Sequence, residues 1–446
     1  MTNLYTDNSI HFLINELEKI DQRILDGDTH QSDENIHRIF AYPAMMVPKT
    51  QKRIVEIITK YLPENAKMID PFMGSATSLL SCMENGLHVY GQDINPLSVL
   101  ISKVKTGPLD YELFKERLDV LSVEIEKDKS PTVDVFFDKI DKWFEKQVQI
   151  DLSKIRRSII LEPDIHVRRF FWVVMAEVIR TCSNDRTSTF KLHRRPDEEI
   201  KSRKISTISE FKKLAERSIW DVKKFKEKLL ENSLLNDRTY FKHAEVKWGN
   251  TMSKIDALEK FSLLVSSPPY GDNHTTVTYG QHSFLQLHWI NRKDISDNDI
   301  DLDYLRTTQE IDRESLGGHS CKVSESHRQG VLKKTPTLEK LISNISENEL
   351  VRYHKVVSFI DDFDKSLDVI INSMEKDAFY VWTIGNRSVN KREIANDLIL
   401  VDLMQYRGIP LIHQAERVIH NKRMPSRNKT TKTMDKEKIL IFHKYI

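Results

Sequence analysis

The stretch MIDPFMGSATSLLSCMENGLHVYGQDI, residues 68–94, decides the fold of this chain. Glycine and proline are sparse, with 13 and 14 residues in the whole sequence, so the glycine-containing loop at 70–78 is informative. A helix-like segment (52–62) precedes this loop, and a second one follows it and ends at Asn85-Gly86, as helices often do. Residues 88–94 are then typical of a short buried strand that ends in a carboxylate. Strand, glycine turn, helix and strand in this order predict the start of a βαβ unit.

Outward from this unit, the remaining chain alternates between helical and strand-like patterns. Residues 98–237 have helical periodicity, many charges and almost no glycine, whereas residues 294–314 form a polar, acidic segment typical of a loop or insertion. Helices are expected at 349–376 and 391–407. Strand-like runs occur at 244–250, 260–271, 378–386, 409–419 and 438–445. We expect one parallel α/β sheet with two insertions, closed at one edge by a hairpin of the last two runs.

Composition bounds the class of protein. The 446 residues are 39% hydrophobic and 30% charged, enough for a folded core, and 68 Lys+Arg against 66 Asp+Glu leave a net charge of only +2. The three cysteines (82, 182 and 321) form no CxxC pair, which argues against a disulfide scaffold or a thiolate zinc site. No apolar run is long enough for a membrane helix, and the first residues contain acids but no basic signal region. We expect a soluble, cytoplasmic protein.

The glycine loop and the carboxylate after it indicate a cofactor site. Gly74 allows the backbone to approach a ligand closely, and Asp93 follows Asp70 by 23 residues, at the end of the next strand. A carboxylate at this spacing commonly binds the two hydroxyls of a ribose, so the pair suggests an adenosine-containing cofactor. Neither a GxGxxG motif nor a Walker A lysine is present. The alternative is a glycine turn that only packs a strand on a helix, with Asp93 as a solvated strand end.

The motif Ser267-Pro268-Pro269-Tyr270 follows an apolar strand. Two prolines cannot continue a central strand, and they hold the preceding carbonyl groups in a stiff, extended arrangement. A rigid carbonyl and the Ser267 hydroxyl can accept hydrogen bonds from an –NH2 group, while Tyr270 offers a flat surface for stacking. These features suit the exocyclic amine of a base. The alternative is a strand that ends in prolines and is held by an aromatic side chain.

Together, these motifs resemble the S-adenosylmethionine-dependent DNA amino-methyltransferases, in particular the N4-cytosine group of restriction–modification systems. The segment DPFMGSATS resembles the cofactor loop of that family, GQDINP (91–96) its ribose-binding strand end, and SSPPYGDN its catalytic motif. HRIFAYPAMMVP (37–48) is similar to the segment that closes over the methionine part of the cofactor, and WTIGNRSV and AERVIHNKRMP to later strands. The resemblance implies a Rossmann-like class I methyltransferase sheet of seven strands with one antiparallel edge strand, and a large helical insertion.

The resemblance also implies roles for individual residues. Cofactor binding falls to Asp70 and Gly74 at the methionine end, Asp93 at the ribose and Asn250 near the adenine, together with Pro43, Phe72, Ser75 and Asn95. Ser267, Pro268, Pro269 and Tyr270 would hold the target base. The sequence departs from the family at Ala76, where a second glycine is usual, and at Asn250, where an acid is more common.

The implied reaction transfers a methyl group directly to the N4 amine of a cytosine that has been flipped out of double-stranded DNA, with no metal. C5 methylation would require a Pro-Cys nucleophile, which is absent. Three alternatives stay open: adenine-N6 methylation of DNA, methylation of an RNA base as in tRNA guanine-N2 enzymes, and a methyltransferase fold that only binds nucleic acid. A restriction endonuclease that acts on the same site is the implied partner.

Two basic segments are candidates for contact with DNA; for the first, the alternative is a solvated helix face whose charges are balanced by its neighbours. Residues 201–228 contain ten Lys/Arg against four Asp/Glu, and residues 416–436 seven against two. Arg186 and Lys191 could also touch DNA or pack over the catalytic face, and His274 and His282 are expected to line the substrate pocket or pack as neutral side chains. We therefore expect four parts in the chain: an N-terminal helical extension (1–35), a catalytic domain (36–97 with 238–446), a helical insertion that recognises the DNA target (98–237), and a second insertion or loop within the catalytic domain (294–348).

Overall fold

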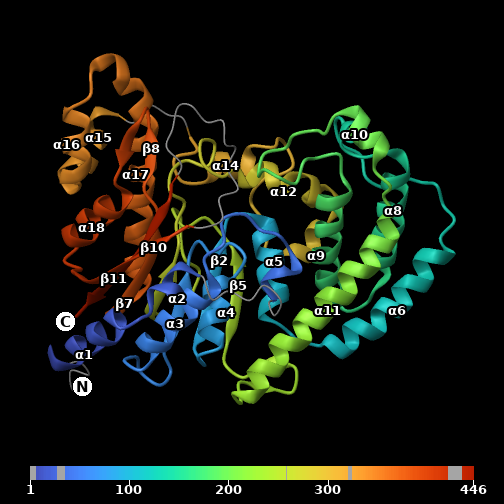
Figure 1. Cartoon of the computed structure of the whole chain (residues 1–446), viewed down its shortest axis with the longest axis horizontal. Coiled ribbons are helices and arrows are strands. Elements are labelled where there is room, and N and C mark those ends of the chain that lie inside the picture. Colours follow the sequence, from blue (N-terminus) through green and yellow to red (C-terminus); the bar gives the residue numbers. More distant parts are fainter. Residues whose placement is uncertain (1–6, 28–35, 258, 320–323, 420–433, 446) are drawn as a thin grey trace.

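A computed structural model describes residues 7–27, 36–257, 259–319, 324–419 and 434–445. Seven strands form one sheet in the order β10-β11-β7-β6-β1-β2-β5, with helices on both of its faces (Figure 1). The strands of this sheet are β1 (Lys67–Asp70), β2 (His88–Asp93), β5 (Ala244–Trp248), β6 (Phe261–Ser266), β7 (Met374–Ile384), β10 (Leu411–Val418) and β11 (Lys436–Lys444). Two short hairpins lie outside it: β3 (Leu235–Asn236) with β4 (Thr239–Tyr240), and β8 (Arg387–Val389) with β9 (Arg392–Ile394).

The predicted βαβ unit forms the centre of the sheet. β1 pairs in parallel with β2 on one side and with β6 on the other, so the glycine loop and the SPPY motif leave the sheet at the same edge. β11 runs antiparallel to both β7 and β10, which makes the closing hairpin that the sequence predicts. The mixed, mostly parallel seven-stranded sheet expected from the family resemblance is thereby confirmed.

Each face of the sheet has its own hydrophobic core, because successive strand residues point to opposite sides. Met68 and Leu263 belong to one core, whereas their neighbours Ile69 and Leu264 belong to the other. The first core is covered by α3 (Pro48–Thr59), α4 (Thr77–Met83) and α5 (Pro96–Thr106). The second is covered by α15 (Glu325–Lys334), α16 (Pro336–Ser343), α17 (Glu347–Ser373) and α18 (Asn396–Tyr406).

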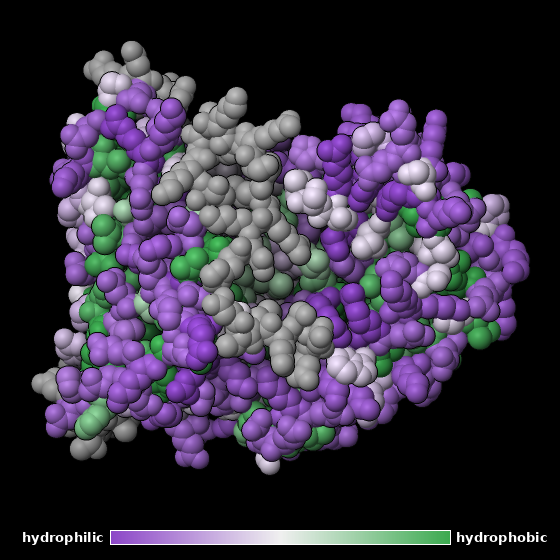
Figure 2. Space-filling model, viewed as in Figure 1, coloured by the Kyte–Doolittle hydropathy of each residue, from purple (hydrophilic) through white to green (hydrophobic). Residues whose placement is uncertain are grey.

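The predicted helical region lies beside the sheet, on the right in Figure 1. It comprises α6 (Tyr111–Lys127), α7 (Ile140–Trp143), α8 (Lys146–Leu161), α9 (Ile165–Cys182), α10 (Asp197–Ser202) and α11 (Thr207–Glu231). Its apolar side chains continue the first core without a break: Phe170 and Trp172 of α9 are fully buried there. The predicted domain boundary after residue 97 falls inside α5. The division of the chain into domains stays a prediction. The outer surface over α6, α8 and α11 is mainly hydrophilic (Figure 2).

The N-terminal segment protects the exposed edge of the sheet. It consists of α1 (Asp7–Glu18) and α2 (Gln22–Asp26), followed by a 3-10 helix, η1 (Ile36–Ile39). Gln22 Nε2 donates to the carbonyl of Glu416 at 2.9 Å, and the Val418 amide donates to Asp26 Oδ1 at 2.7 Å. The Glu416 carbonyl and the Val418 amide both belong to the edge strand β10. Contacts with α2 therefore satisfy backbone groups that could otherwise pair with a strand of another molecule.

The structure contradicts one expectation about local structure and gives detail to another, which left a loop or an insertion open. The helix predicted at 391–407 begins only at Asn396, because Asn390 and Lys391 adopt positive φ angles of 49° and 65° and make the turn between β8 and β9. The acidic segment at 294–314 is not one loop. It overlaps α13 (Arg292–Ile295) and α14 (Glu310–Glu314), which follow α12 (Tyr279–Trp289). No helix among the described residues has the length and apolar character needed to cross a membrane.

Candidate active site

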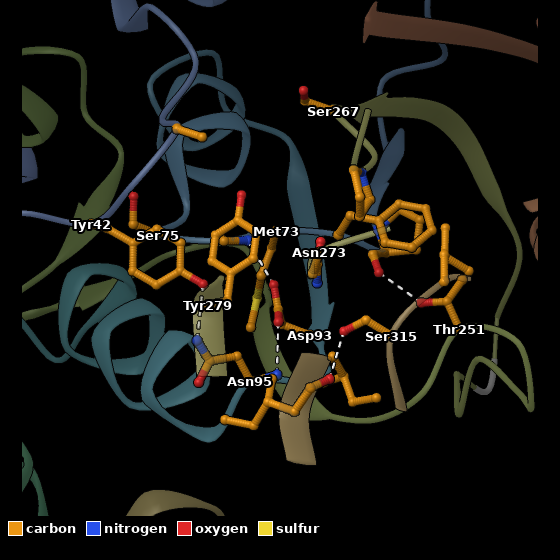
Figure 3. A pocket seen from close by; sticks show the side chains of 18 of the residues that line it. Tyr42, Met73, Ser75, Asp93, Asn95, Thr251, Ser267, Asn273, Tyr279 and Ser315 are labelled. Atoms are coloured by element: carbon orange, nitrogen blue, oxygen red, sulfur yellow. Dashed lines mark hydrogen bonds between the residues drawn. The ribbon is translucent and has the colours of Figure 1, made fainter. Parts of the chain in front are cut away.

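A cavity of about 840 Å³, open to solvent, lies at the carboxyl ends of β1, β2 and β6 (Figure 3). This is where ligands bind in open α/β sheets, because the loops after the strands converge there. Its lining comes from five parts of the chain. These are residues 42 and 44–46, the glycine loop (71–75 and 77), the ends of β2 and β5 (93–95 and 249–251), the SPPY region with α12 (267, 269, 273 and 279), and α14 with its C-terminal end (311, 315 and 316).

Asp70 holds the glycine loop from beneath and is not in the cavity wall. Its side chain is fully buried, and Oδ1 accepts hydrogen bonds from the Phe72 amide at 3.0 Å and from Ser266 Oγ at 2.6 Å. Oδ2 accepts from Ser78 Oγ. Burial raises the pKa of Asp70 to about 6. The side chain that the resemblance assigns to the methionine end therefore shapes the loop, and Phe72, Gly74 and Ser75 belong to the part of the loop that lines the cavity.

Glycine is favoured at position 74 because its φ is +50°, a left-handed conformation that residues with a Cβ rarely adopt. Ala76 also has a positive φ, 69°, which explains why a glycine is usual at this place. Its methyl group packs into the first core and does not line the cavity.

Asp93 sits at the centre of the cavity floor (Figure 3). Oδ2 accepts a hydrogen bond from the Gly74 amide at 2.9 Å, and Oδ1 accepts one from the Asn95 amide at 2.8 Å. These two bonds fix the carboxylate between the glycine loop and the start of α5. Burial raises the pKa of Asp93 to about 6. Each oxygen keeps a lone pair that can accept a ligand hydroxyl.

Asn95 and Asn250 line the cavity, but their side chains also have structural partners. Asn95 caps α5 by accepting from the Leu97 amide at 3.1 Å, and it donates to the Tyr42 hydroxyl at 3.2 Å and to Ser283 Oγ at 2.9 Å. Asn250 Oδ1 accepts from the Met252 amide at 2.9 Å. An amide at position 250 thus holds the loop after β5, a task that needs an acceptor but no charge.

The four residues of the SPPY motif are not equivalent. Ser267 and Pro269 line the cavity, Pro268 is buried behind them, and Tyr270 is partly buried. The Tyr270 hydroxyl donates to Glu437 Oε1 at 3.0 Å and lies 3.2 Å from Ser267 Oγ. Gly385 lies against the Tyr270 ring, since a Cβ built on Gly385 would be 2.7 Å from it. The motif is therefore braced by β7 and β11.

Several lining residues were not predicted as site residues. Tyr42, Ala44, Met45 and Met46 surround Pro43, which does not line the cavity itself. The family-like segment 37–48 already pointed to this place, although not to the right side chain. Others include Thr251, Asn273, Tyr279, Ile311, Ser315 and Leu316. Tyr279 stacks on Tyr42 with ring centroids 5.7 Å apart. Only the tertiary contact of α12 and α14 with the loops brings these residues together.

His282, Cys82 and Cys182 behave as packed side chains. Burial lowers the pKa of His282 to about 3, and its ring contacts those of Phe40, Tyr42 and Phe190, so it is neutral. Cys82 and Cys182 are buried and do not line the cavity, and burial raises the pKa of Cys182 to about 11. Cys321 lies outside the described residues.

The basic strip at 201–228 is largely neutralised by its neighbours. Six of its ten basic residues form ion pairs: Lys212 with Glu126, Lys213 with Glu210, Lys223 and Lys224 with Glu227, Lys226 with Glu112, and Lys228 with Glu84. The second basic segment, 416–436, falls mostly outside the described residues, since 420–433 are not described.

The segment 183–196 lies beside the cavity. The Leu192 amide donates to Gln281 Oε1 at 3.2 Å, and Thr278 Oγ1 donates to the Phe190 carbonyl at 3.4 Å, which fixes the segment against the start of α12. Arg186 and Lys191 are exposed on it. In the part of the chain that the structure describes, neither side chain forms an ion pair with the protein.

No protein-family model matches the chain. The Type II methyltransferase M.MvaI of Kocuria varians is 32% identical over 456 aligned positions, which cover 96% of this chain and 97% of the relative. The Type II methyltransferase M.MjaII of Methanocaldococcus jannaschii is 36% identical over 115 positions, 25% of this chain and 21% of the relative. The chain therefore belongs to the Type II methyltransferases, the DNA methyltransferases of restriction–modification systems.

Proposed function

We propose that this protein methylates the N4 amine of a specific cytosine in double-stranded DNA, with S-adenosylmethionine as the methyl donor. The observation that supports this most is a single cavity that joins the glycine loop and Asp93 to Ser267 and Pro269. A donor bound at the first pair and an amine bound at the second would meet inside one cavity.

The residues present fit S-adenosylmethionine. Asp93 offers two fixed carboxylate oxygens to a ribose, and the Ser75 hydroxyl is buried in the cavity wall without a hydrogen-bond partner among the described residues. Phe72, Ile94 and Leu316 add apolar surface for a flat base and a methionine chain. When bound, the cofactor supplies an electrophilic methyl group on a sulfonium. The protein contributes position and electrostatics.

Ser267 and the main-chain carbonyl of Pro268 would bind the amine. The cytosine amine is a poor nucleophile because its lone pair is delocalised into the ring. Two acceptors that bind its hydrogens favour a pyramidal nitrogen and direct the lone pair into the cavity. A base inside a duplex cannot reach this depth, so the target must flip out of the helix.

The hydroxyl at position 267 supports cytosine over adenine as the target. A serine is a smaller and neutral acceptor, whereas adenine-N6 enzymes of the same family usually have an aspartate or asparagine there. The biological role that follows is protection of host DNA, in the cytoplasm, from a restriction endonuclease with the same recognition site.

The test is nucleoside mass spectrometry of DNA from a host strain that has no DNA methylation of its own and expresses this protein. N4-methylcytosine is expected, and it should be absent when Ser267→Ala is expressed at the same level. Exclusive N6-methyladenine would refute the cytosine assignment. Methylated nucleosides in RNA alone, or in neither nucleic acid, would favour an RNA enzyme or a binding protein.

We also propose that segment 183–196 contacts the DNA backbone, as the part of the helical region nearest the cavity. Arg186→Ala with Lys191→Ala should weaken DNA binding and reduce the salt dependence of log Kd by about two phosphate contacts. The matched control is Lys213→Ala with Lys223→Ala, which removes the same charge from ion-paired positions of α11. Equal losses in both double variants would contradict this assignment.

A further inference from the structure

The hydroxyl of Tyr270 connects the catalytic motif to the last strand of the sheet. It lies 3.0 Å from Glu437 Oε1 and 3.2 Å from Ser267 Oγ. Glu437 belongs to β11, 167 residues further along the chain, and reaches the motif because β11 pairs with β7 beside β6. A residue without any motif of its own therefore touches the SPPY element.

The Glu437 carboxylate is held in one orientation by Arg417 of β10. Arg417 Nε and Nη2 both donate to Glu437 Oε2, at 2.7 and 2.6 Å, which leaves Oε1 for Tyr270. The side chains of Arg417 and Glu437 are only 9% and 12% exposed. Charge-assisted hydrogen bonds in such a shielded place are strong, because water does not compete for them.

The hydrogen bonds that link Ser267, Tyr270, Glu437 and Arg417 can be arranged in only one direction. An ionised carboxylate accepts hydrogen bonds and cannot donate, and a guanidinium donates and cannot accept. The Tyr270 hydroxyl must therefore donate to Glu437, and burial together with the Glu437 charge raises its pKa well above the usual value, so it keeps its proton. Its oxygen is left to accept from the Ser267 hydroxyl.

Tyr270 is also fixed at its other end. Asn396 Nδ2 donates to the Tyr270 carbonyl at 2.9 Å and to the Gly385 carbonyl at 2.9 Å. The ring rests against Gly385, whose missing side chain leaves the room for it. Because its main chain is held by Asn396 and its ring by Gly385, the Tyr270 hydroxyl stays directed at Glu437.

We propose that the Arg417–Glu437 pair sets the hydrogen-bond direction of the catalytic serine: it turns the Ser267 proton toward Tyr270 and leaves the Ser267 oxygen as an acceptor for the target amine. This inference rests on the proposed function. Arg417 and Glu437 are positioning residues in it, because they act through Tyr270 and do not touch the substrate.

Glu437→Gln tests the direction without changing the size of the side chain. Because Arg417 can only donate, the carboxamide oxygen must face Arg417 and the –NH2 group must face Tyr270. Tyr270 then accepts from position 437 and donates to Ser267, whose proton is displaced toward the target amine. We expect kcat to fall by about tenfold to a hundredfold, with unchanged S-adenosylmethionine affinity by calorimetry.

The double variant Arg417→Met/Glu437→Gln distinguishes an effect of hydrogen-bond direction from a general disturbance of the structure at position 437. Without the guanidinium, the carboxamide can turn its oxygen back to Tyr270, so the double variant should recover most of the kcat that Glu437→Gln loses. Glu416→Gln is the matched control. Glu416 lies on the same hairpin and pairs with Lys436 at 2.5 Å, away from Tyr270, so kcat should stay at the wild-type value.

Each result decides the inference. A kcat for Glu437→Gln equal to that of Glu416→Gln overturns it, and so does a double variant that is no more active than the single one. If Glu437→Gln does not fold, as judged by thermal unfolding, Tyr270→Phe replaces it. Without the tyrosine hydroxyl as acceptor, the Ser267 proton is no longer held away from the target amine, so kcat should fall while S-adenosylmethionine affinity is kept, and a wild-type kcat refutes the proposal. Absence of methylated DNA with the wild-type protein would instead refute the proposed function.

Discussion

Replacement of Asp93 by asparagine tests the cofactor assignment through its pH dependence. In the wild-type protein, burial raises the pKa of Asp93 to about 6, while both oxygens accept backbone hydrogen bonds from Gly74 and Asn95. Only the ionised carboxylate can accept hydrogen bonds from two ribose hydroxyls at once. We therefore expect S-adenosylmethionine to bind to the ionised form and to lose affinity as the pH falls.

The size of the effect follows from this pKa. Above about pH 7 the carboxylate is mostly ionised and the affinity should be constant, whereas at about pH 5 only about one tenth of it is ionised and Kd should be about tenfold higher. Asparagine does not titrate. In Asp93→Asn, Kd should be about tenfold higher than wild type at pH 8, because a charged acceptor is lost, and it should change much less between pH 8 and pH 5.

Isothermal titration calorimetry with S-adenosylmethionine at several pH values measures both quantities. Asp185→Asn is a suitable control, because burial also raises the pKa of Asp185 to about 6, but this residue lies outside the cofactor cavity and accepts from the His193 amide at 2.6 Å. It should keep the wild-type pH dependence. An Asp93→Asn variant that keeps that dependence, or that binds with wild-type affinity at pH 8, would refute the ribose assignment.

Two further substitutions test residues that lie outside the cavity lining, Asp312 in α14 and Gly385 after β7. Asp312 is fully buried, its Oδ2 has no hydrogen-bond partner among the described residues, and burial raises its pKa from 3.8 to about 7. The folded state therefore loses stability as the pH rises between these two values. In urea unfolding, Asp312→Asn should be more stable than wild type by up to about 4 kcal/mol at pH 8, with no gain near pH 4. Gly385→Ala should lower kcat while S-adenosylmethionine affinity is kept, because its Cβ would lie 2.7 Å from the Tyr270 ring and displace it. Gly330→Ala, in open space on α15, should leave kcat unchanged, and an equal loss there would contradict the steric argument.

The central strands and the two motif loops could be predicted from the sequence, because the information is local. A buried strand, a glycine turn at Gly74 and two prolines at 268 and 269 each act on their own backbone. Their order along the chain, together with the rule that parallel strands end at one edge, already brings Asp93 and Ser267 to the same place.

The remaining parts of the site depend on contacts between distant segments. Tyr279 and Ser315 reach the cavity only because α12 and α14 pack over it, and no periodicity marks them. The strip at 201–228 is strongly basic in sequence, yet its acidic partners include Glu84, Glu112 and Glu126, which are far away in the chain. A charge pattern in sequence cannot show which charges are already paired.

The stretch 68–94 and the SPPY motif thus determined the type of fold and the edge of the sheet that carries the site. Tertiary structure alone decided which side chains face the cavity, that Asp70 lies beneath the loop, and that Glu437 holds Tyr270. The physical reason is the range of the interactions: backbone conformation is set by neighbours in sequence, whereas burial, ion pairing and hydrogen-bond direction are set by neighbours in space.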